Sequence, residues 1–398
     1  MSESKTKNVP LLAVLAVLAL IGLCAWIFQQ MRGLSVTGMD NLTSWGTYIC
    51  MFMLFVGLSA GGLIVASAAS VFNIEQFKAI AKPAIALSTA CIVAAGLFVL
   101  VDLGGIQRVW RMLTGPNFAS PLVWDMIVIT CYLVLNIAYL YLYTRPAPDA
   151  ARIKAVSFVA LPVAVLVHSV TAWIFGLEIA RDWYSSIMAP LFVASALDSG
   201  LALLLITLAA LAAKGLFATG KDLFTMLAGL LAVFVAFDAF MVGCEILTMA
   251  YPGGEQGAYL AQLAFGPTAP FFWFEVVCGL AIPFAMLAPR KQRENRALVV
   301  AASCLVVLGV FYKRVWLLFT AFQVPNIDAA PGVTVGNVNL AGSTAYAMLG
   351  TYAPTLVELA VAVGVISLCA LGYLALLRRV LLEGSAPVSP TAVSGETA

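Results

Sequence analysis

The sequence predicts an all-α integral membrane protein of about ten transmembrane helices, arranged as two four-helix bundles with two peripheral helices. Hydrophobic residues make up 63% of the 398 residues and charged residues only 10%, whereas a soluble domain carries about 25% charged residues. Apolar runs of about 20 residues recur, and each is long enough to cross a hydrocarbon core ~30 Å thick. The mean hydropathy of +1.02 agrees with these runs. The composition therefore excludes a soluble protein.

Each apolar run is expected to be a helix, because the polar backbone groups of a single segment must pair within that segment in lipid. The first run, in MSESKTKNVPLLAVLAVLALIGLCAW, imitates a signal peptide. It is long for one and lacks a small-x-small cleavage site, so we expect an uncleaved first helix. The ten expected spans are residues 9–28, 45–70, 79–101, 120–143, 153–177, 189–212, 222–250, 268–288, 297–321 and 351–378.

A weak internal repeat suggests how the spans group. Trp45 precedes Gly62 by 17 residues, and Trp183 precedes Gly200 by the same number, four spans further on. A parallel repeat of two bundles accounts for this spacing; small residues that let helices approach closely would account for the glycines alone. The expected segments are 1–44 (first helix and outer loop), 45–177 and 178–321 (the two bundles), 322–380 (outer loop and last helix) and 381–398 (disordered cytoplasmic tail).

The basic residues predict the orientation, because cytoplasmic loops of membrane proteins are enriched in Lys and Arg. With the N-terminus in the cytoplasm, fifteen basic residues lie on the inner side and six on or near the outer side. We therefore expect a multi-pass protein of a bacterial cytoplasmic membrane with both termini inside. The bases lie at helix ends and form no patch with interleaved aromatics, so the net charge of +2 gives no reason to expect nucleic-acid binding.

Cysteine and histidine usage argues against a metal centre in this chain. No two of the eight cysteines are closer than 26 positions, whereas iron–sulfur and zinc sites usually use closely spaced cysteines. A haem held between two helices commonly needs two His ligands, and His168 is the only histidine. We expect no haem, iron–sulfur cluster or other metal here.

Ionisable groups inside a membrane are costly and indicate function by default. Here they lie in the outer half or near the midplane of the expected spans, and the inner half has none except at helix ends. His168 is the one group whose ordinary pKa lies near neutrality, so it is the candidate for proton exchange with a bound molecule. Three alternatives stay open: a single hydrogen bond between helices for His168, a neutralising pair with Glu245 or Glu358 for Arg314, and a membrane-interface aromatic for Trp183.

Two functions fit this distribution. A quinol-binding redox subunit needs acid–base groups for the head group, an apolar slot for the tail and an electron acceptor, which a partner must supply here. A secondary transporter of a small solute also has about ten spans, a repeat and midplane charges, but its site must open to both sides in turn. The uncharged inner half favours the quinol-binding subunit.

Several segments stand in a fixed order along the chain: TSWGTYICMFMLFVGLSAGG (43–62), DLGGIQRVWRMLTGPNFASPLVWD (102–125), LPVAVLVHSVTAWIF (161–175), RDWYSSIMAPLFVASALDSGLALL (181–204), CEILTMAYPG (244–253), FFWFEVVCGLAIP (271–283) and GVFYKRVWL (309–317). In these segments the chain resembles the membrane subunits of the polysulfide reductase (NrfD-like) family, in particular its ten-span branch. The resemblance implies a subunit that binds menaquinone or ubiquinone near the outer face. It also implies docking to a ferredoxin-like iron–sulfur subunit, which usually connects to a molybdopterin catalytic subunit or to multihaem cytochromes.

The site residues expected from charge placement and from the resemblance fall into two groups. The quinone-binding group is Tyr48, Asp102, Arg108, Arg111, His168 and Trp183, with His168 as the catalytic acid–base. The proton-transfer group is Asp198, Asp238, Glu245, Glu275, Arg314 and Glu358. One departure concerns the family's quinone-site Asn and His, which align here with Ile49 and Phe52, so Tyr48 and His168 are the candidate replacements. We expect protons to leave outward without being pumped across.

Overall fold

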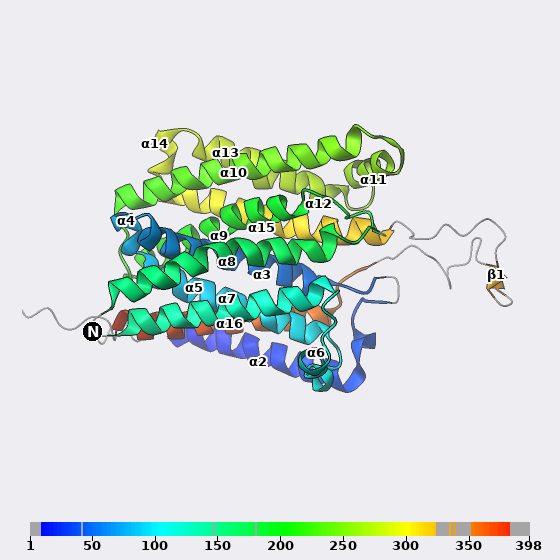
Figure 1. Cartoon of the computed structure of the whole chain (residues 1–398), viewed down its shortest axis with the longest axis horizontal. Helices are drawn as coiled ribbons and strands as arrows, with labels where there is room; N and C mark the ends of the chain where they lie inside the picture. Colours follow the sequence, from blue (N-terminus) through cyan, green and yellow to red (C-terminus); the bar gives the residue numbers. More distant parts are fainter. Residues whose placement is uncertain are drawn as a thin grey trace, which may run out of the picture.

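The computed structural model describes residues 9–40, 43–145, 148–179, 181–323, 334–335, 338–339 and 352–382. Within these residues, ten helices are long and apolar enough to cross a membrane, and they run side by side along one axis (Figure 1). The predicted all-α integral membrane fold is therefore confirmed. The tail, predicted to be disordered, lies from residue 383 on outside the described residues.

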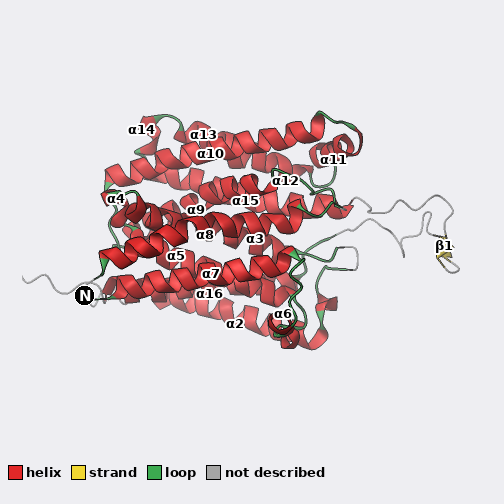
Figure 2. Cartoon of the chain, viewed as in Figure 1, coloured by secondary structure: helices red, strands yellow, loops and turns green. Residues whose placement is uncertain are grey.

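Helices account for nearly all of the regular structure (Figure 2). The spans are α2 (Val9–Arg32), α3 (Thr47–Val71), α5 (Ala81–Asp102), α7 (Pro121–Thr144), α8 (Ala150–Gly176), α9 (Met188–Ala213), α10 (Lys221–Ala250), the continuous run α12 (Ala269–Trp273), η3 (Phe274–Ala281) and α13 (Ile282–Leu287), α15 (Arg296–Gln323) and α16 (Leu356–Leu382). The short elements are η1 (Leu34–Val36), α4 (Glu75–Lys78), η2 (Ile106–Arg108), α6 (Arg111–Thr114), α11 (Gly254–Phe265), α14 (Arg290–Arg293) and the antiparallel pair β1 (Thr334–Val335) and β2 (Val338–Asn339).

Three spans differ from their predicted form. The first continues to Arg32 rather than ending at residue 28, which brings Gln29 into the helix. The last begins at Leu356 rather than 351, because Thr355 caps it. The eighth is not uniform: η3 is a π-helix, a wider turn that occurs often at functional sites.

The bundle has two unlike ends. The segments 33–40, 43–46, 103–120, 177–179, 181–187 and 251–268 lie together at one end, here called the loop end, with α6 and α11 (Figure 1). The short, mostly basic links 72–80, 148–149, 214–220 and 288–295 and residue 145 lie at the other, the basic end, with α4 and α14. Span direction alternates between these ends, so depth below the loop end can be read from position along each helix at about 1.5 Å per residue.

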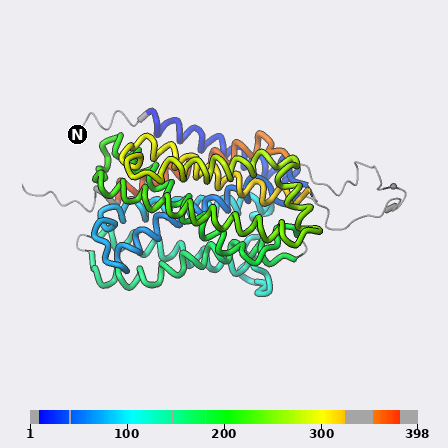
Figure 3. The backbone as a smooth tube through the Cα atoms, turned by 90° about the horizontal axis from the view of Figure 1, so that it is seen from above, coloured from blue at the N-terminus to red at the C-terminus, as the bar shows by residue number. Residues whose placement is uncertain are grey.

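The helices can be described as two groups of four with two further helices. The first bundle is α3, α5, α7 and α8, and the second is α9, α10, the α12–α13 run and α15. The two bundles meet mainly where α3 packs on α9. The remaining spans, α2 and α16, pack against each other and α16 covers α5, which leaves α2 along the edge of the molecule (Figure 3).

Glycine contacts set the closest crossings. A Cβ atom on Gly61 of α3 would overlap the backbone of Gly200 on α9, and one on Gly200 would overlap Gly61. The predicted repeat paired Gly200 with Gly62, but Gly62 instead faces the backbone of Ala84 on α5. At the loop end, the indole rings of Trp45 and Trp183 stack with their centroids 6.0 Å apart. The two tryptophans at equivalent positions of the predicted repeat therefore contact each other directly.

Candidate functional site

Side chains with buried polar atoms form two separate clusters in the half of the bundle nearer the loop end. The groove cluster lies on α2, α3 and α5 and consists of Trp26, Gln29, Gln30, Tyr48 and Asp102. The ionic cluster lies mainly in the second bundle and consists of His168, Asp198, Asp238, Glu245, Glu275, Lys313 and Arg314. The predicted quinone-binding and proton-transfer residues are divided between these clusters and the protein surface.

A hydrogen-bonded chain joins three helices in the groove cluster. The Tyr48 hydroxyl donates to Oε1 of Gln29 at 2.6 Å, and Nε2 of Gln29 donates to the Val101 carbonyl at 2.9 Å. Tyr48 and Gln29 are both buried. Because the Gln29 amide uses one atom as acceptor and the other as donor, its orientation follows from its partners. Asp102, the last residue of α5, directly follows Val101.

An apolar groove leads to this cluster from the side of the molecule. It has a volume of about 170 Å³ and lies between α2, α5 and α16. Its lining includes Trp26 and Val101, and also Leu23 and Leu368, whose side chains are exposed on the lipid-facing surface. The groove therefore connects the hydrocarbon phase with the carbonyl that Gln29 binds.

Three polar atoms of the groove cluster are buried without a hydrogen-bond partner among the described residues: Nε1 of Trp26, Nε2 of Gln30 and Oδ1 of Asp102. Gln29 and Gln30 follow Trp26 by three and four residues on α2, so both lie on the same side of the helix as Trp26. Buried polar groups are nearly always paired, and each exception asks for an explanation. Two donors and one acceptor beside an apolar groove fit a ligand with a polar head and an apolar tail.

Glu358 lies close to the groove cluster, but its oxygens are already occupied. Oε2 accepts from the backbone N–H groups of Gly38 and Thr355, at 2.8 and 2.9 Å, and Oε1 accepts from the Tyr352 hydroxyl at 2.5 Å. The Glu358 N–H in turn bonds Thr355 Oγ1 at 3.3 Å, which completes a capping box at the start of α16. Burial and the Glu358 carboxylate raise the pKa of Tyr352, so it remains a donor. These contacts favour a structural role for Glu358 over the predicted proton transfer.

Lys313 is the centre of the ionic cluster. Its ammonium nitrogen lies 3.1 Å from Oε1 of Glu275 and 3.6 Å from Oδ1 of Asp238, with all three side chains buried. The Trp316 indole donates to the other oxygen of Glu275 at 2.5 Å. Glu275 belongs to the π-helical turn η3, which places its carboxylate against α15. The ion pair left open as an alternative in the sequence analysis involved Arg314 rather than Lys313.

Arg314 makes different contacts. Its Nη2 donates to Ser195 Oγ at 2.6 Å, and its guanidinium carbon lies 3.8 Å from the centre of the Phe192 ring. Within the described residues it forms no ion pair closer than 4.0 Å with Glu245 or Glu358, the partners predicted as alternatives. It interacts electrostatically with all four carboxylates of the ionic cluster, including Asp198, and with His168.

His168 lies in α8 with its imidazole buried, and its Nε2 has no hydrogen-bond partner among the described residues. It belongs to the side of the ionic cluster nearest Arg314 rather than to the groove cluster. Cys50 of α3 lies between the two clusters, because it interacts electrostatically with both Arg314 and Asp102, and its Sγ lies 3.6 Å from the Arg314 carbonyl oxygen. Among the described residues, no hydrogen bond joins the predicted pair of Tyr48 and His168, since Tyr48 bonds Gln29 instead.

Trp183 lines a small cavity of about 30 Å³ between the ionic cluster and the loop end. Glu245 and Tyr259 line the same cavity. Glu245 is the carboxylate of the ionic cluster that lies nearest the loop end. Asp182 lines the cavity as well. Burial and, to a smaller extent, the negative charge of Glu255 raise the pKa of Asp182, whereas the positive charge of Arg181 lowers it. The Trp183 ring also packs edge-on against Phe175 and Phe322.

Arg108 and Arg111 lie apart from both clusters. They are exposed in η2 and α6 at the loop end, and neither forms an ion pair with Asp102 among the described residues. Arg111 instead lies over the Trp110 ring, 5.8 Å from its centre. Their exposure suits a surface contact more than a head-group pocket.

The sequence analysis did not identify Trp26, Gln29 and Gln30. A usable signal was present, since two consecutive glutamines end an otherwise apolar run. Among the described residues, no group of three His, Cys, Asp or Glu side chains has a metal-binding arrangement; the absence of a resident metal stays a prediction.

The comparison with known proteins identifies the architecture. The sequence profile described as polysulphide reductase, NrfD, matches residues 35–326. The chain belongs to the NrfD family. A putative membrane subunit of the dimethyl sulfoxide reductase of Halobacterium salinarum is 40% identical to it, over 96% of this chain and 94% of that protein.

Two further relatives of this NrfD protein are more distant. A selenate reductase subunit of Mesobacillus selenatarsenatis is 26% identical over 89% of this chain and 90% of its own. The Hdr-like menaquinol oxidoreductase integral membrane subunit of Archaeoglobus fulgidus is 27% identical over 90% and 89%, respectively. The resemblance predicted from the sequence motifs is confirmed.

Proposed function

We propose that this NrfD protein is the quinol-binding membrane subunit of a respiratory reductase complex. In this proposal it exchanges electrons between menaquinol or ubiquinol and an iron–sulfur partner subunit docked at the loop end. Family membership supports the general role, and the name of the Archaeoglobus relative refers to menaquinol. The observation that carries the proposal is the lipid-facing groove lined by Trp26 and Val101, next in sequence to Asp102, whose Oδ1 is buried without a hydrogen-bond partner among the described residues.

The residues of the groove cluster fit a quinol head group. Such a ligand carries two hydroxyls on a flat ring and an apolar isoprenoid tail, and when bound it supplies two electrons and two protons. Asp102 Oδ1 offers an acceptor for one hydroxyl, and the Trp26 indole N–H offers a donor. The apolar walls between α2, α5 and α16 accommodate the tail, so entry from the membrane needs no aqueous path.

Asp102 is the group that we assign to proton acceptance. It stands at the last residue of α5, where the chain leaves the span at the loop end, so a proton taken up by its carboxylate has a short way to water. Gln29 and Tyr48 hold the neighbouring polar wall in place through their shared hydrogen bond. This assigns to a carboxylate the acid–base role that the sequence analysis gave first to His168.

The ionic cluster stores protons in this proposal. Its four carboxylates face only two bases, so full ionisation leaves two negative charges in a low-dielectric interior. Uncompensated buried charge is costly, which favours proton uptake by this cluster. Glu245 beside the small cavity at Trp183 gives the cluster its nearest approach to the loop end.

The loop end suits a docked partner. Large apolar side chains lie exposed there on separate segments: Trp110, Leu113, Phe118, Ile179, Tyr251 and Phe265. Exposed apolar surface of this kind marks interaction sites. The concentration of Lys and Arg at the basic end supports a cytoplasmic position for that end, so in this proposal the loop end and its iron–sulfur partner lie outside. The proposal further assigns the protein to a bacterial cytoplasmic membrane and includes a molybdopterin subunit in the complex.

Titration of the purified protein with a quinone analogue tests the proposal, with quenching of tryptophan fluorescence as the readout. Asp102→Asn should weaken binding about tenfold or more, the usual size of a hydrogen bond to a charged group. Asp125→Asn is the matched control, because Asp125 is a buried carboxylate on α7 that bonds Thr171 at 2.6 Å away from the groove. Equal dissociation constants for both variants would refute the site. Failure of the wild-type protein to bind any analogue would favour the transporter alternative.

A further inference from the structure

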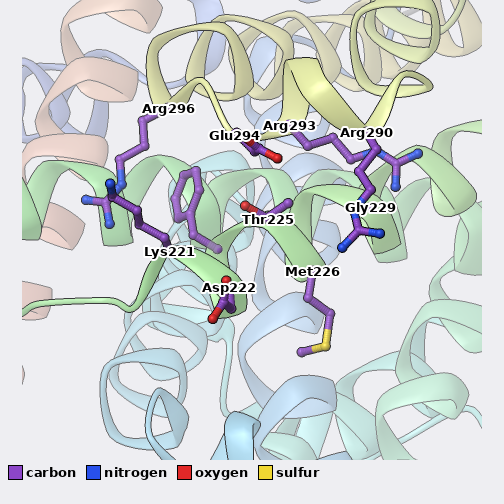
Figure 4. A pocket seen from close by; sticks show the side chains of 10 residues that line it. Lys221, Asp222, Thr225, Met226, Gly229, Arg290, Arg293, Glu294 and Arg296 are labelled. Atoms are coloured by element: carbon purple, nitrogen blue, oxygen red, sulfur yellow. The ribbon is translucent and has the colours of Figure 1, made fainter.

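A large cavity lies at the opposite end from the proposed quinol site. It has a volume of about 960 Å³ and lies between the start of α10, the short helix α14 and the start of α15 (Figure 4). Four bases line it, together with two acids: Lys221, Arg290, Arg293, Arg296, Asp222 and Glu294. Four positive and two negative charges leave a net charge of two positive units, so the cavity suits an anion.

Two of the arginines are held rigidly by the backbone. Arg293 donates through Nε to the Leu287 carbonyl at 2.5 Å and through Nη2 to the Ala288 carbonyl at 2.7 Å. These carbonyls belong to the end of α13, where helices leave acceptors unpaired. Its third nitrogen, Nη1, faces Gly229 of α10, where an added Cβ atom would lie 2.8 Å from it. Because Gly229 has no side chain, the Arg293 guanidinium can lie close against α10 at this position (Figure 4).

Arg296 is fixed in a similar way, by a bond to the Thr219 carbonyl at 2.7 Å and by stacking 5.3 Å above the Phe224 ring. Lys221 and Arg290 differ, because within the described residues neither has a hydrogen bond or an ion pair. Asp222 and Glu294 likewise lie more than 4.0 Å from every described base. The cavity thus combines two pre-positioned guanidinium groups with two uncommitted cations.

The cavity continues into a lipid-facing surface. Met226, which lines it, begins a stripe on α10 with Val233, Phe237 and Phe240. Their spacing of seven, four and three residues puts them on one helix face, and they are 37, 62, 42 and 62% exposed, respectively. The stripe runs from the basic end into the span, so an acyl chain can lie along it while a head group occupies the cavity.

We propose that this cavity is a binding site for an anionic phospholipid, with the phosphate held by Lys221, Arg290 and Arg293 and one acyl chain along the α10 stripe. Basic pockets between transmembrane helices at the membrane surface are suited to such head groups. A free phosphate would use the cations but would gain nothing from the apolar stripe. The lipid joins α10 to α14 and so fixes the second bundle at its basic end.

Native mass spectrometry of the full-length, delipidated protein, titrated with phosphatidylglycerol or cardiolipin, tests this assignment. The double variant Lys221→Gln/Arg290→Gln removes only the two uncommitted cations. It should bind the anionic lipid about 30-fold more weakly, which corresponds to about 2 kcal/mol at about 1 kcal/mol per cation. The matched control is Lys154→Gln/Lys214→Gln, which removes two exposed charges from the same end and should leave the affinity within twofold.

Three results would overturn the proposal. They are unchanged affinity in the Lys221→Gln/Arg290→Gln variant, an equal loss in the control variant, and equal binding of zwitterionic phosphatidylcholine. Competition arms with inorganic phosphate and with glycerol phosphate separate lipid from free phosphate. Displacement of the lipid by either soluble anion at millimolar concentration would assign the cavity to a soluble phosphate instead, whereas lack of displacement supports the lipid.

Discussion

The hydroxyl of Tyr48 on α3 donates to the side-chain carbonyl of Gln29 on α2 at 2.6 Å, and both groups are buried. This bond ties the edge helix α2 to the first bundle, three residues along α2 from Trp26, which lines the apolar groove. It also fixes the Gln29 amide, whose other end holds the Val101 carbonyl beside Asp102. The edge helix is therefore part of the proposed quinol site rather than only a membrane anchor.

Removal of the Tyr48 hydroxyl should loosen this wall of the site. Tyr48→Phe is expected to weaken quinone-analogue binding about 2- to 12-fold, the usual range for one neutral hydrogen bond. The matched variant is Tyr139→Phe, since Tyr139 is buried in the same bundle and bonds Ser67 and Ser157 nearer the basic end. Its affinity should match the wild type. A similar loss in both variants would show a general effect on the first bundle.

Substitutions at Glu358 distinguish a structural role from proton transfer. Glutamine retains the capping box, so Glu358→Gln should keep quinol oxidation and its pH profile in the assembled complex. Glu358→Ala removes the cap and the bonds to Gly38 and Tyr352, and should lower the melting temperature through loss of at least about 1 kcal/mol. Loss of turnover in Glu358→Gln at unchanged melting temperature would restore the proton-transfer assignment.

The ion pairs of Lys313 predict strong coupling within the second bundle. Lys313→Met leaves Glu275 and Asp238 without their nearest base, and removing one partner of a buried pair typically costs about 3–5 kcal/mol. The double variant Lys313→Met/Glu275→Gln should recover part of that stability. Thermal unfolding in detergent measures both, with the exposed Lys154→Met as the control. An unchanged melting temperature in Lys313→Met would argue against the ion pairs, and quinone affinity should stay near the wild-type value in every folded variant.

The crossing of α3 and α9 gives a test of the bundle interface. A side chain at Gly61 overlaps the Gly200 backbone, so Gly61→Val should destabilise the protein by at least about 1–3 kcal/mol, the cost of overpacking. Gly96→Val is the control, because nothing lies within 4 Å of a Cβ atom there. Limited proteolysis of the folded protein compares the two. Equal resistance would mean that the helices separate without cost.

The number and type of spans could be predicted because lipid requires every spanning segment to satisfy its own backbone hydrogen bonds. Lateral packing follows weaker rules, since apolar side chains gain little from leaving lipid for one another. The sequence therefore identified Tyr48 and Asp102 but gave no reason to place Gln29 beside them. Lys313 and Arg314 are adjacent in sequence, yet only the structure shows that Lys313 holds the carboxylates while Arg314 bonds Ser195.

Photoaffinity labelling tests the location of the quinol site most directly. A quinone with a photoreactive group on its tail, irradiated with the wild-type protein in membranes and mapped by peptide mass spectrometry, should label the groove walls. The predicted adducts lie on α2 between Ala19 and Trp26 and on α16 between Val361 and Leu368, and excess unlabelled quinone should suppress them. Labelling confined to the cavity around Trp183, Glu245 and Tyr259, with none on α2 or α16, would contradict the account.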